Sequence, residues 1–204
     1  MDQAQVAVSL AEELEGKAAL ELEAIYREHS ALVSKWVRRL WGPNGAGVVD
    51  AEDLLHEVFL VVQRRLPGFR GEAALTTWLY SITVLVVSGR RQKERWRRWL
   101  WRRAAPELSL LHEPTAAATQ EDFDRAEASR QVYAVLDELR ERDRTLMILF
   151  ELERLPGSEI ACIVGISERN VWVGLSRARA RFKQVFERRF GVAETAQGVS
   201  HGDG

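Results

Sequence analysis

The stretch that decides the fold reads GSEIACIVGISERNV and occupies residues 157–171. Its apolar residues recur at helical spacing up to Gly165, which can adopt the left-handed backbone conformation of a tight turn. Ser167 then stands where the N-cap of a second helix is expected. A short helix, a glycine turn and a capped second helix form the layout of a helix-turn-helix, so the stretch predicts a DNA-reading element.

The second helix, expected from Ser167 to Phe190, has an apolar stripe that should face the core: Val171, Leu175, Ala178 and Phe182. The opposite face should read DNA: Arg169 can pair with guanine, Asn170 can pair with adenine, and Val173 can touch a thymine methyl group. Ser176 lies on the same face. Phosphates are expected to be held by Arg177, Arg179, Arg181 and Lys183. The pattern alone leaves two other interpretations open, a solvated surface and a helix that binds a protein partner.

Basic charge is concentrated in two segments, although the formal net charge of the 204 residues is −1. Residues 88–103 carry eight basic side chains against Glu94, a local net charge of +7, and residues 167–189 carry seven against two acids, a net charge of +5. A local basic face matters more for phosphate binding than the total charge. The segregation therefore predicts two nucleic-acid surfaces.

The chain has one cysteine, Cys162, in an apolar context. A single cysteine cannot form an intramolecular disulfide, so a reducing compartment fits, and we expect Cys162 to be a small buried core residue. No run is apolar for the roughly 18 residues that a membrane span requires, and the acidic N-terminus is unlike a signal peptide. We expect a cytoplasmic protein without membrane insertion.

Nearly every segment follows helical periodicity, so an all-α fold is expected. Gly42 with Pro43, and Pro67 with Gly68, should end the first two helices, and Thr76 or Thr77 should cap a third. A Pro-containing, irregular segment indicates a flexible linker between two small helical domains. The expected divisions are an N-terminal extension at 1–19, a helical domain at 20–103, the linker at 104–128, a second domain at 129–190 and a disordered tail at 191–204.

The helix that begins near Asp50 carries acids on one face. Asp50, Asp53 and Glu57 are spaced three and four residues apart, with Glu52 beside them. Like charges at this spacing repel by a few tenths of a kcal/mol per pair. The face is therefore either a docking surface for a basic partner or a solvated surface, and the pattern alone does not choose.

Aromatic residues alternate with arginines after this helix: Phe69, Trp78, Tyr80, Trp96, Trp99 and Trp101. Single-stranded nucleic acid needs rings for its bases and cations for its backbone, and stacking can contribute about 1–3 kcal/mol per base. Core packing explains Trp78 equally well.

Three runs carry a resemblance to a known family: DAEDLLHEVF at 50–59, FRGE at 69–72 and TTWLY at 76–80. Together they closely resemble the second conserved region of bacterial sigma factors of the extracytoplasmic-function (ECF) group. The C-terminal pair, through LSRAR at 175–179, looks like the fourth region of the same proteins. The two resemblances cover about residues 20–190, in the family's order and with a linker where the family has one.

The resemblance implies a subunit that joins RNA polymerase core, directs it to promoters and helps to open the duplex, with no covalent chemistry, metal or cofactor. The acidic face, Asp50, Asp53 and Glu57 with Leu54, would bind the clamp helices of the largest polymerase subunit, and the other large subunit would also be contacted. The minus-ten element would be bound by Phe69, Arg70, Thr77, Trp78, Tyr80, Arg90, Arg91 and Arg95. The minus-thirty-five element would be bound by Ser167, Arg169, Asn170, Val173, Ser176, Arg177, Arg179 and Arg181. An anti-sigma factor is a further expected partner.

Several positions depart from the family pattern. Leu85 and Gly89 stand where many members have Asn and Asp, and His56 replaces a frequent Gln. On the helix expected to read DNA, Trp172, Val173 and Gly174 replace polar or basic residues. A glycine inside a helix costs about 1 kcal/mol relative to alanine, so Gly174 is expected to weaken that helix.

Two other functions are compatible with parts of the sequence. An autonomous helix-turn-helix regulator would use the same C-terminal reader, but the chain offers no candidate ligand pocket, phosphoacceptor domain or dimer surface. A helical-bundle metalloenzyme is suggested by Asp53-x-x-His56 with Glu52 and Glu57 nearby. Such sites need a repeated motif on a second helix, which His29, His112 and His201 do not supply.

Overall fold

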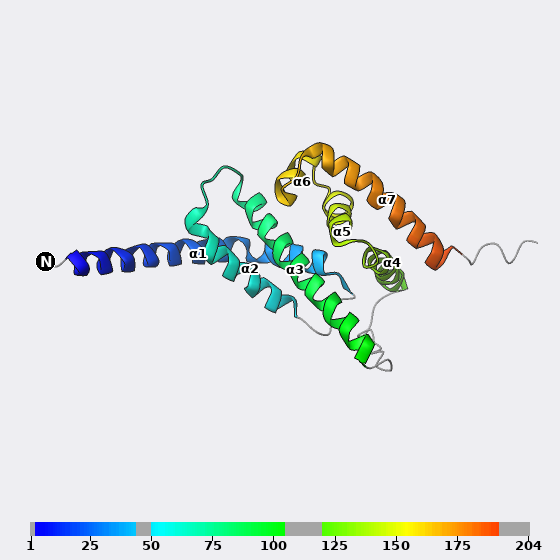
Figure 1. Ribbon diagram of the computed structural model, residues 1–204, viewed down its shortest axis with the longest axis horizontal. Helices are drawn as coiled ribbons and strands as arrows, with labels where there is room; N and C mark the ends of the chain where they lie inside the picture. The colour runs from blue at the N-terminus through cyan, green and yellow to red at the C-terminus, as the bar shows by residue number, and fades with distance from the viewer. Residues whose placement is uncertain (1–2, 44–49, 105–119, 192–204) are drawn as a thin grey trace, which may run out of the picture. The chain divides into compact units, whose positions relative to one another are not determined.

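The computed structural model describes residues 3–43, 50–104 and 120–191. Every regular element within these ranges is helical, so the expectation of an all-α fold is confirmed. The helices form two compact units, one with α1 to α3 and one with α4, α5, most of α6 and α7 (Figure 1). Most of the segment expected as a linker, and the tail after Gly191, lie outside the described residues.

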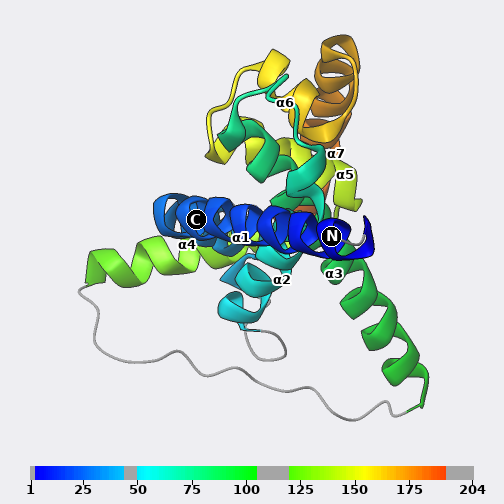
Figure 2. The same ribbon diagram turned by 90° about the vertical axis from the view of Figure 1, so that its left-hand side faces the viewer.

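In the described ranges, the first unit contains α1 (Gln3–Trp41), α2 (Ala51–Arg65), the short 3₁₀ turn η2 (Leu66–Gly68) and α3 (Leu75–Ala104). Helices α2 and α3 both pack against α1 and against each other (Figures 1 and 2). Their apolar stripes meet in one core, which includes Val33, Val37, Leu54, Val58, Val62, Leu79 and Ile82. Because α1 begins at Gln3, the segment expected as an N-terminal extension continues into the first helix.

Local turn chemistry sets the ends of these helices. Gly42 has a φ of 82°, and its N–H bonds the carbonyl of Arg38, as expected for a residue that ends a helix. The Asp50 side chain accepts the N–H of Glu52 at 3.3 Å and caps α2. The third helix begins at Leu75, ahead of Thr76, so the expectation that Thr76 or Thr77 caps it is wrong.

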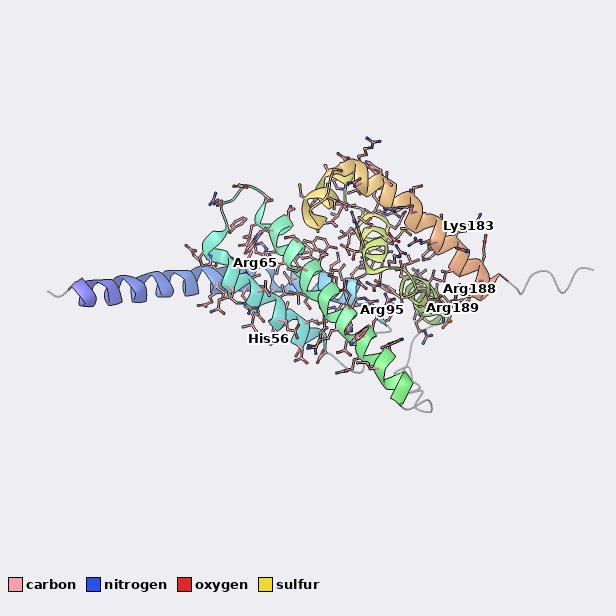
Figure 3. The ribbon with its side chains drawn as sticks, in the orientation of Figure 1. His56, Arg65, Arg95, Lys183, Arg188 and Arg189 are labelled. Atoms are coloured by element: carbon pink, nitrogen blue, oxygen red, sulfur yellow. The ribbon has the colours of Figure 1, made fainter. Side chains whose placement is uncertain are left out.

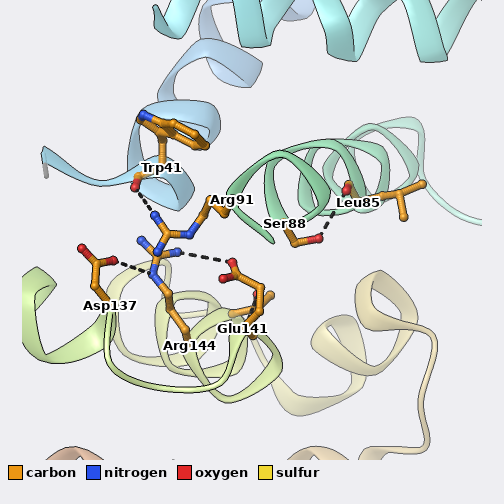
Figure 4. Close-up of polar contacts among 8 residues, drawn as sticks. Trp41, Leu85, Ser88, Arg91, Asp137, Glu141 and Arg144 are labelled. Carbon is orange, nitrogen blue, oxygen red and sulfur yellow. Dashed lines mark hydrogen bonds and ion pairs between the residues drawn. The ribbon is translucent and has the colours of Figure 1, made fainter. Parts of the chain in front are cut away.

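A buried arginine joins the end of α1 to α3. Nη1 of Arg91 donates to the carbonyl oxygen of Trp41 at 2.7 Å, and its guanidinium lies 5.9 Å from the centre of the Trp41 ring (Figure 4). This contact satisfies one of the carbonyls that the last turn of a helix leaves without an intrahelical partner. Arg91 is 5% exposed, so it serves the fold of this unit rather than its surface.

Between residues 120 and 191, the second unit contains α4 (Gln120–Leu136), α5 (Glu141–Met147), the π-helical turn η3 (Ile148–Leu152), α6 (Gly157–Val164) and α7 (Glu168–Phe190). Helix α4 begins inside the range expected for the linker. Helix α7 packs along α5, and the buried side chains include Leu146, Ile148, Leu149, Ile160, Val171 and Leu175. Arg144, only 1% exposed, lies 3.4 Å from Asp137, and this contact ties α5 to the residue that follows α4 (Figure 4). Its 3.9 Å contact with Glu141 lies within α5.

Cys162 corrects one expectation. It is exposed, whereas Ile160, Ala161 and Ile163 beside it are buried. Helix α6 is short and turns about 100° per residue, so one position in this apolar run faces outward. Residue type alone did not reveal which one.

Candidate nucleic-acid interface

The turn between α6 and α7 has the geometry expected of a helix-turn-helix. Gly165 has φ 70° and ψ 41°, the left-handed conformation, and its N–H bonds the carbonyl of Ala161 at 2.9 Å. The Ser167 side chain accepts the N–H of Asn170 at 3.4 Å and caps α7. The local sequence therefore predicted this turn correctly. The Ser167 hydroxyl, which was expected to contact DNA, is engaged in capping α7.

The inner face of α7 follows the predicted stripe. Val171, Leu175 and Ala178 are fully buried, while Phe182 is only partly buried. Gly174 lies on this inner face as well, and a Cβ built there would stand 2.5 Å from Cδ1 of Leu146. Since Leu146 is fully buried, glycine at 174 permits the close approach of α7 to α5, which explains this departure from the family pattern.

The outer face of the first three turns of α7 presents the expected reading residues. Arg169, Asn170, Val173, Ser176 and Arg177 are all exposed. Within the part of the chain that the structure describes, neither Arg169 nor Arg177 has an ion-pair partner. Both guanidinium groups are therefore available to bases or phosphates.

Two arginines expected to hold phosphates are already paired within the second unit. Arg179 lies 2.7 Å from Glu151 and 5.1 Å from the centre of the Phe150 ring, and Arg181 lies 2.8 Å from Asp143. Their charge is partly compensated, so the residues expected to hold phosphates are not equally available to DNA. The sequence carried no local signal for this, because the paired residues are 28 and 38 positions apart.

Positive charge at the end of α7 is also partly compensated by acids. Glu138 pairs with both Arg188 and Arg189, which extend from the last turns of α7 (Figure 3). Lys183, also labelled there, faces Glu187 at 3.7 Å. Among the described arginines of α7, Arg169 and Arg177 are therefore the ones that no acid side chain engages.

Trp172 has a structural role that the sequence did not reveal. Its ring packs edge-on against Phe150, with 5.4 Å between ring centres, and it covers Gly157 at the start of α6. A Cβ at Gly157 would stand 2.7 Å from Cζ2 of Trp172. Trp172 thus braces the two helices of the motif against each other, although 44% of its surface remains exposed.

The acidic face of α2 is present on the first unit. Asp50, Glu52 and Asp53 are exposed, and Oε1 of Glu57 lies 3.1 Å from Nη1 of Arg90 on α3. Leu54 is fully buried in the core between the helices. The expectation that Leu54 contacts a partner directly is therefore wrong; its side chain fixes α2 from beneath.

The residues expected at the minus-ten element divide into buried and surface groups. Tyr80 is 2% exposed and stacks on Trp36 with 4.2 Å between ring centres, and Arg91 is buried against Trp41. Neither can contact DNA directly, because both are already used in the core. The other members are exposed or partly buried: Phe69, Arg70, Thr77, Trp78, Arg90 and Arg95. Figure 3 labels Arg95 on the second half of α3, and the side chain of Trp101 lies outside the described residues.

Phe69 and Trp78 form an aromatic pair beside the loop that precedes α3. Their ring centres are 4.7 Å apart, both rings are partly buried, and Arg70 is exposed next to them. A partly buried ring is held in place while its outer edge stays accessible. This is the arrangement that base stacking beside a cation requires.

A shallow groove of about 410 Å³ lies between α2 and α3. Its lining includes the exposed apolar side chains of Leu60 and Leu85, and Glu57, Arg64, Arg90 and Lys93 contribute charged groups. Leu85 and Gly89, which depart from the family pattern, both line this groove. Where many family members carry Asn and Asp, this groove is therefore lined by an apolar side chain at 85 and by a residue without a side chain at 89.

The described ranges contain no group of three His, Cys, Asp or Glu side chains that could hold a metal ion. The Asp53-x-x-His56 motif thus brings no further ligand close, and Nδ1 of His56 lies 3.0 Å from the carbonyl oxygen of Glu52 in its own helix. No helix in the same ranges is long and apolar enough to cross a bilayer.

Comparison with known proteins identifies the same family for both units. The family model described as Sigma-70 region 2 matches residues 25–103, and the model described as Sigma-70, region 4 matches residues 129–182. The chain is 31% identical over 170 residues to the ECF RNA polymerase sigma-E factor of Escherichia coli, an alignment that covers 79% of this chain and 83% of that protein. It is 24% identical over 143 residues to the probable RNA polymerase sigma factor RfaY of Xanthomonas campestris, covering 70% of this chain and 36% of that protein.

A solved structure is similar as well. The sigma factor RpoE of Bartonella quintana, crystallised with the anti-sigma factor NepR, has a TM-score of 0.52 and 14% identity, with 82% of this chain and 97% of that one covered. At this identity the likeness supports the fold alone.

Proposed function

The chain belongs to the ECF group of the sigma-70 family and is an alternative sigma factor, and from this premise we propose how its surfaces divide the work of transcription initiation. Sigma factors bind RNA polymerase core and are not enzymes. The questions specific to this chain are which side chains bind the polymerase and which bind the promoter. We further propose that it acts in the cytoplasm, where its polymerase partner works.

The first turns of α7 read the minus-thirty-five element. The observation that carries this assignment is the exposed set Arg169, Asn170, Val173, Ser176 and Arg177 on a helix whose opposite face is buried. A helix presented in this way fits the major groove with its N-terminal residues toward the base edges. Arg169 and Asn170 then supply base contacts, and Arg177 supplies a phosphate contact.

The acidic face of α2 docks on the polymerase core. Asp50, Glu52 and Asp53 are exposed at the N-cap and in the first turn of α2, and their mutual repulsion is relieved by a basic partner. The partner proposed is the pair of clamp helices of the largest subunit, with further contact to the other large subunit. Leu54 contributes indirectly, because its burial fixes the orientation of the helix.

The loop before α3 and the first turns of α3 capture unpaired bases of the minus-ten element. Phe69 and Trp78 offer aromatic edges, Arg70 offers a cation beside them, and Thr77 precedes Trp78 on the helix. Arg95 lies about 26 Å farther along α3, so it is assigned to the DNA backbone rather than to the same bases. Each stacked base can contribute about 1–3 kcal/mol, which favours the melted state of the promoter. Strand opening is thus driven by binding energy, with no covalent step.

An anti-sigma factor is a further proposed partner. The structurally similar RpoE was crystallised with one, and this supports the class of partner rather than its identity. Such a protein would need to cover at least one of the two surfaces described above, the acidic face of α2 or the reading face of α7.

Reconstitution with purified core polymerase tests the proposed function. Core with this protein should select promoter fragments from a genomic library, start transcripts at defined positions and make thymines near the start site reactive to permanganate. Core alone should do none of these. An autonomous regulator would instead bind duplex DNA without core and start no transcripts, and that result would overturn the proposal.

A further inference from the structure

Two large apolar side chains are exposed on the part of α7 that we assign to the minus-thirty-five element. Trp172 is 44% exposed and Val173 is 49% exposed. They lie three and four positions after Arg169, and Ser176 lies seven positions after it. Residues at these spacings are neighbours on one helix surface. Arg169, Trp172, Val173 and Ser176 therefore form one surface, which we call the reading patch, with an apolar centre between an arginine and a serine.

The reading patch faces away from the core of the second unit. Val173 lies about 160° around the helix from both Val171 and Leu175, which are fully buried. Trp172 lies about 100° from Val171, at the edge of the outer face. An apolar side chain thus occupies the middle of the face that a DNA groove would meet, and a second one borders it.

The indole of Trp172 is held in place although nearly half of its surface is exposed. Its ring centre lies 5.4 Å from that of Phe150, and a Cβ built on Gly157 would stand 2.7 Å from Cζ2 of the indole. Part of the ring therefore rests on η3 and on the start of α6. Because packing already restricts this side chain, binding through its exposed surface costs little further rotamer entropy.

We infer that the reading patch selects DNA through the 5-methyl groups of thymine, with Val173 and Trp172 as the contacts. The inference rests on the function proposed for α7 and names the chemical group that this helix selects. Thymine presents its methyl group in the major groove, where apolar side chains can contact it. Burial of one methyl group changes Kd by about fourfold. Since relatives carry polar or basic residues at positions 172 and 173, the promoters preferred by this chain should differ from theirs.

The surroundings of the apolar pair favour DNA over a protein partner. Arg169 lies beside the pair and Arg177 lies one turn after Val173; both are exposed, and no acid in the described ranges pairs with either of them. A specific protein interface buries roughly 800 Å² per partner around an apolar core, far more than two side chains provide. Two methyl groups on neighbouring bases need only these two contacts, and the arginines suit the phosphates beside them.

Selection of DNA by the full-length protein, with and without core polymerase, tests the inference. The probe is a duplex library randomised over the upstream element. The selected sequences should contain thymines whose replacement by uracil weakens binding by about fourfold each, because uracil lacks the methyl group but pairs identically. Val173→Ser should abolish the preference for thymine over uracil at one position, and Trp172→Ala should abolish it at another.

The ratio of affinities for thymine and uracil probes separates methyl recognition from a structural role. If Trp172 only braced the motif, Trp172→Ala would weaken both probes equally and leave the ratio unchanged. Val173 is exposed, so Val173→Ser should fold normally, and circular dichroism checks both variants. Phe186→Ala removes a ring that is 38% exposed on a later turn of α7; it is the matched control and should keep the wild-type ratio.

Three outcomes would overturn the inference. The protein could select no sequence in either form, the wild type could bind uracil and thymine probes equally, or both variants could keep the wild-type ratio. Loss of core binding together with an unchanged ratio would assign the patch to a protein partner. The proposed function fails separately: if the protein starts no transcripts with core but uracil still weakens its DNA binding, methyl recognition stands without it.

Discussion

Glu57 on α2 and Arg90 on α3 neutralise each other, with 3.1 Å between Oε1 and Nη1. One is a candidate polymerase-docking acid and the other a candidate promoter-binding arginine. In the free protein, these two groups are therefore ion-paired with each other. A partner that binds the Glu57 carboxylate removes this contact and makes the Arg90 guanidinium more available to DNA. Arg90 then keeps only its weaker contact with Glu94, whose Oε1 lies 3.7 Å from the Arg90 Nε.

Arg90→Gln should raise the affinity for core polymerase, because it releases Glu57. The two side chains are 29% and 39% exposed, and a pair of this kind is worth about 0.2–1 kcal/mol, so the gain should be at most about fivefold. Fluorescence anisotropy with labelled core measures it. Glu57→Gln is the matched control and should weaken core binding; a loss of core affinity in Arg90→Gln would contradict the assignment.

Asp53→Lys should weaken core association by about tenfold or more, since a cation would then face the basic partner. Asp53 is exposed, so the fold should be unaffected. Glu127→Lys on α4 makes the same charge change on the second unit and should have little effect. The DNA affinity of the protein without core should be the same in both variants. Equal core affinity in Asp53→Lys and the wild type would remove the docking assignment.

Arg169→Ala and Arg177→Ala should weaken DNA binding in different ways. Loss of a bidentate base contact by Arg169 should cost about 1–3 kcal/mol on the preferred promoter and relax selectivity at one position. Loss of a phosphate contact by Arg177 should weaken binding to all sequences and reduce the slope of log K against log salt by about one. Titration of matched and mutated promoter fragments at several salt concentrations separates the two. Identical behaviour would show that α7 does not divide its contacts in this way.

Glu151→Gln should strengthen non-specific DNA binding. It frees Arg179, which now pairs with Glu151 at 2.7 Å, and so adds one available cation to α7. The salt slope should steepen by up to about one. Glu153→Gln, a neighbouring acid that does not pair with Arg179 in the structure, controls for the change in net charge. If the two variants bind DNA equally, the Arg179–Glu151 pair does not limit phosphate binding.

Gly174→Ala and Gly89→Ala should have opposite effects on stability. Alanine is favoured over glycine in a helix by about 1 kcal/mol. At Gly89 a Cβ meets nothing within 4 Å, so the substitution should stabilise by up to about that amount. At Gly174 the Cβ would stand 2.5 Å from fully buried Leu146, and overpacking of this kind should cost about 1–3 kcal/mol. Thermal unfolding measures both, and stabilisation by Gly174→Ala would show that Leu146 can move aside.

Short-range features of the site could be predicted because their partners are close in sequence. Gly165 and Ser167 act on neighbours within four residues, and Asp50 caps its own helix. The stripe of Val171, Leu175 and Ala178 follows from helical periodicity alone. Residue type was a weaker guide where a helix has only a few turns, as Cys162 illustrates.

The sequence by itself determined the helical class, the helix-turn-helix, the acidic face of α2 and the two basic segments. The tertiary structure alone decided which of those charges and rings remain available. Tyr80 and Arg91 are used inside the core, while Arg179 and Arg181 are paired with acids 28 and 38 residues away. Periodicity specifies which face of a helix a side chain occupies, but its partner is set by which other helix packs there. That choice depends on contacts between segments far apart in the chain, for which local sequence carries no signal.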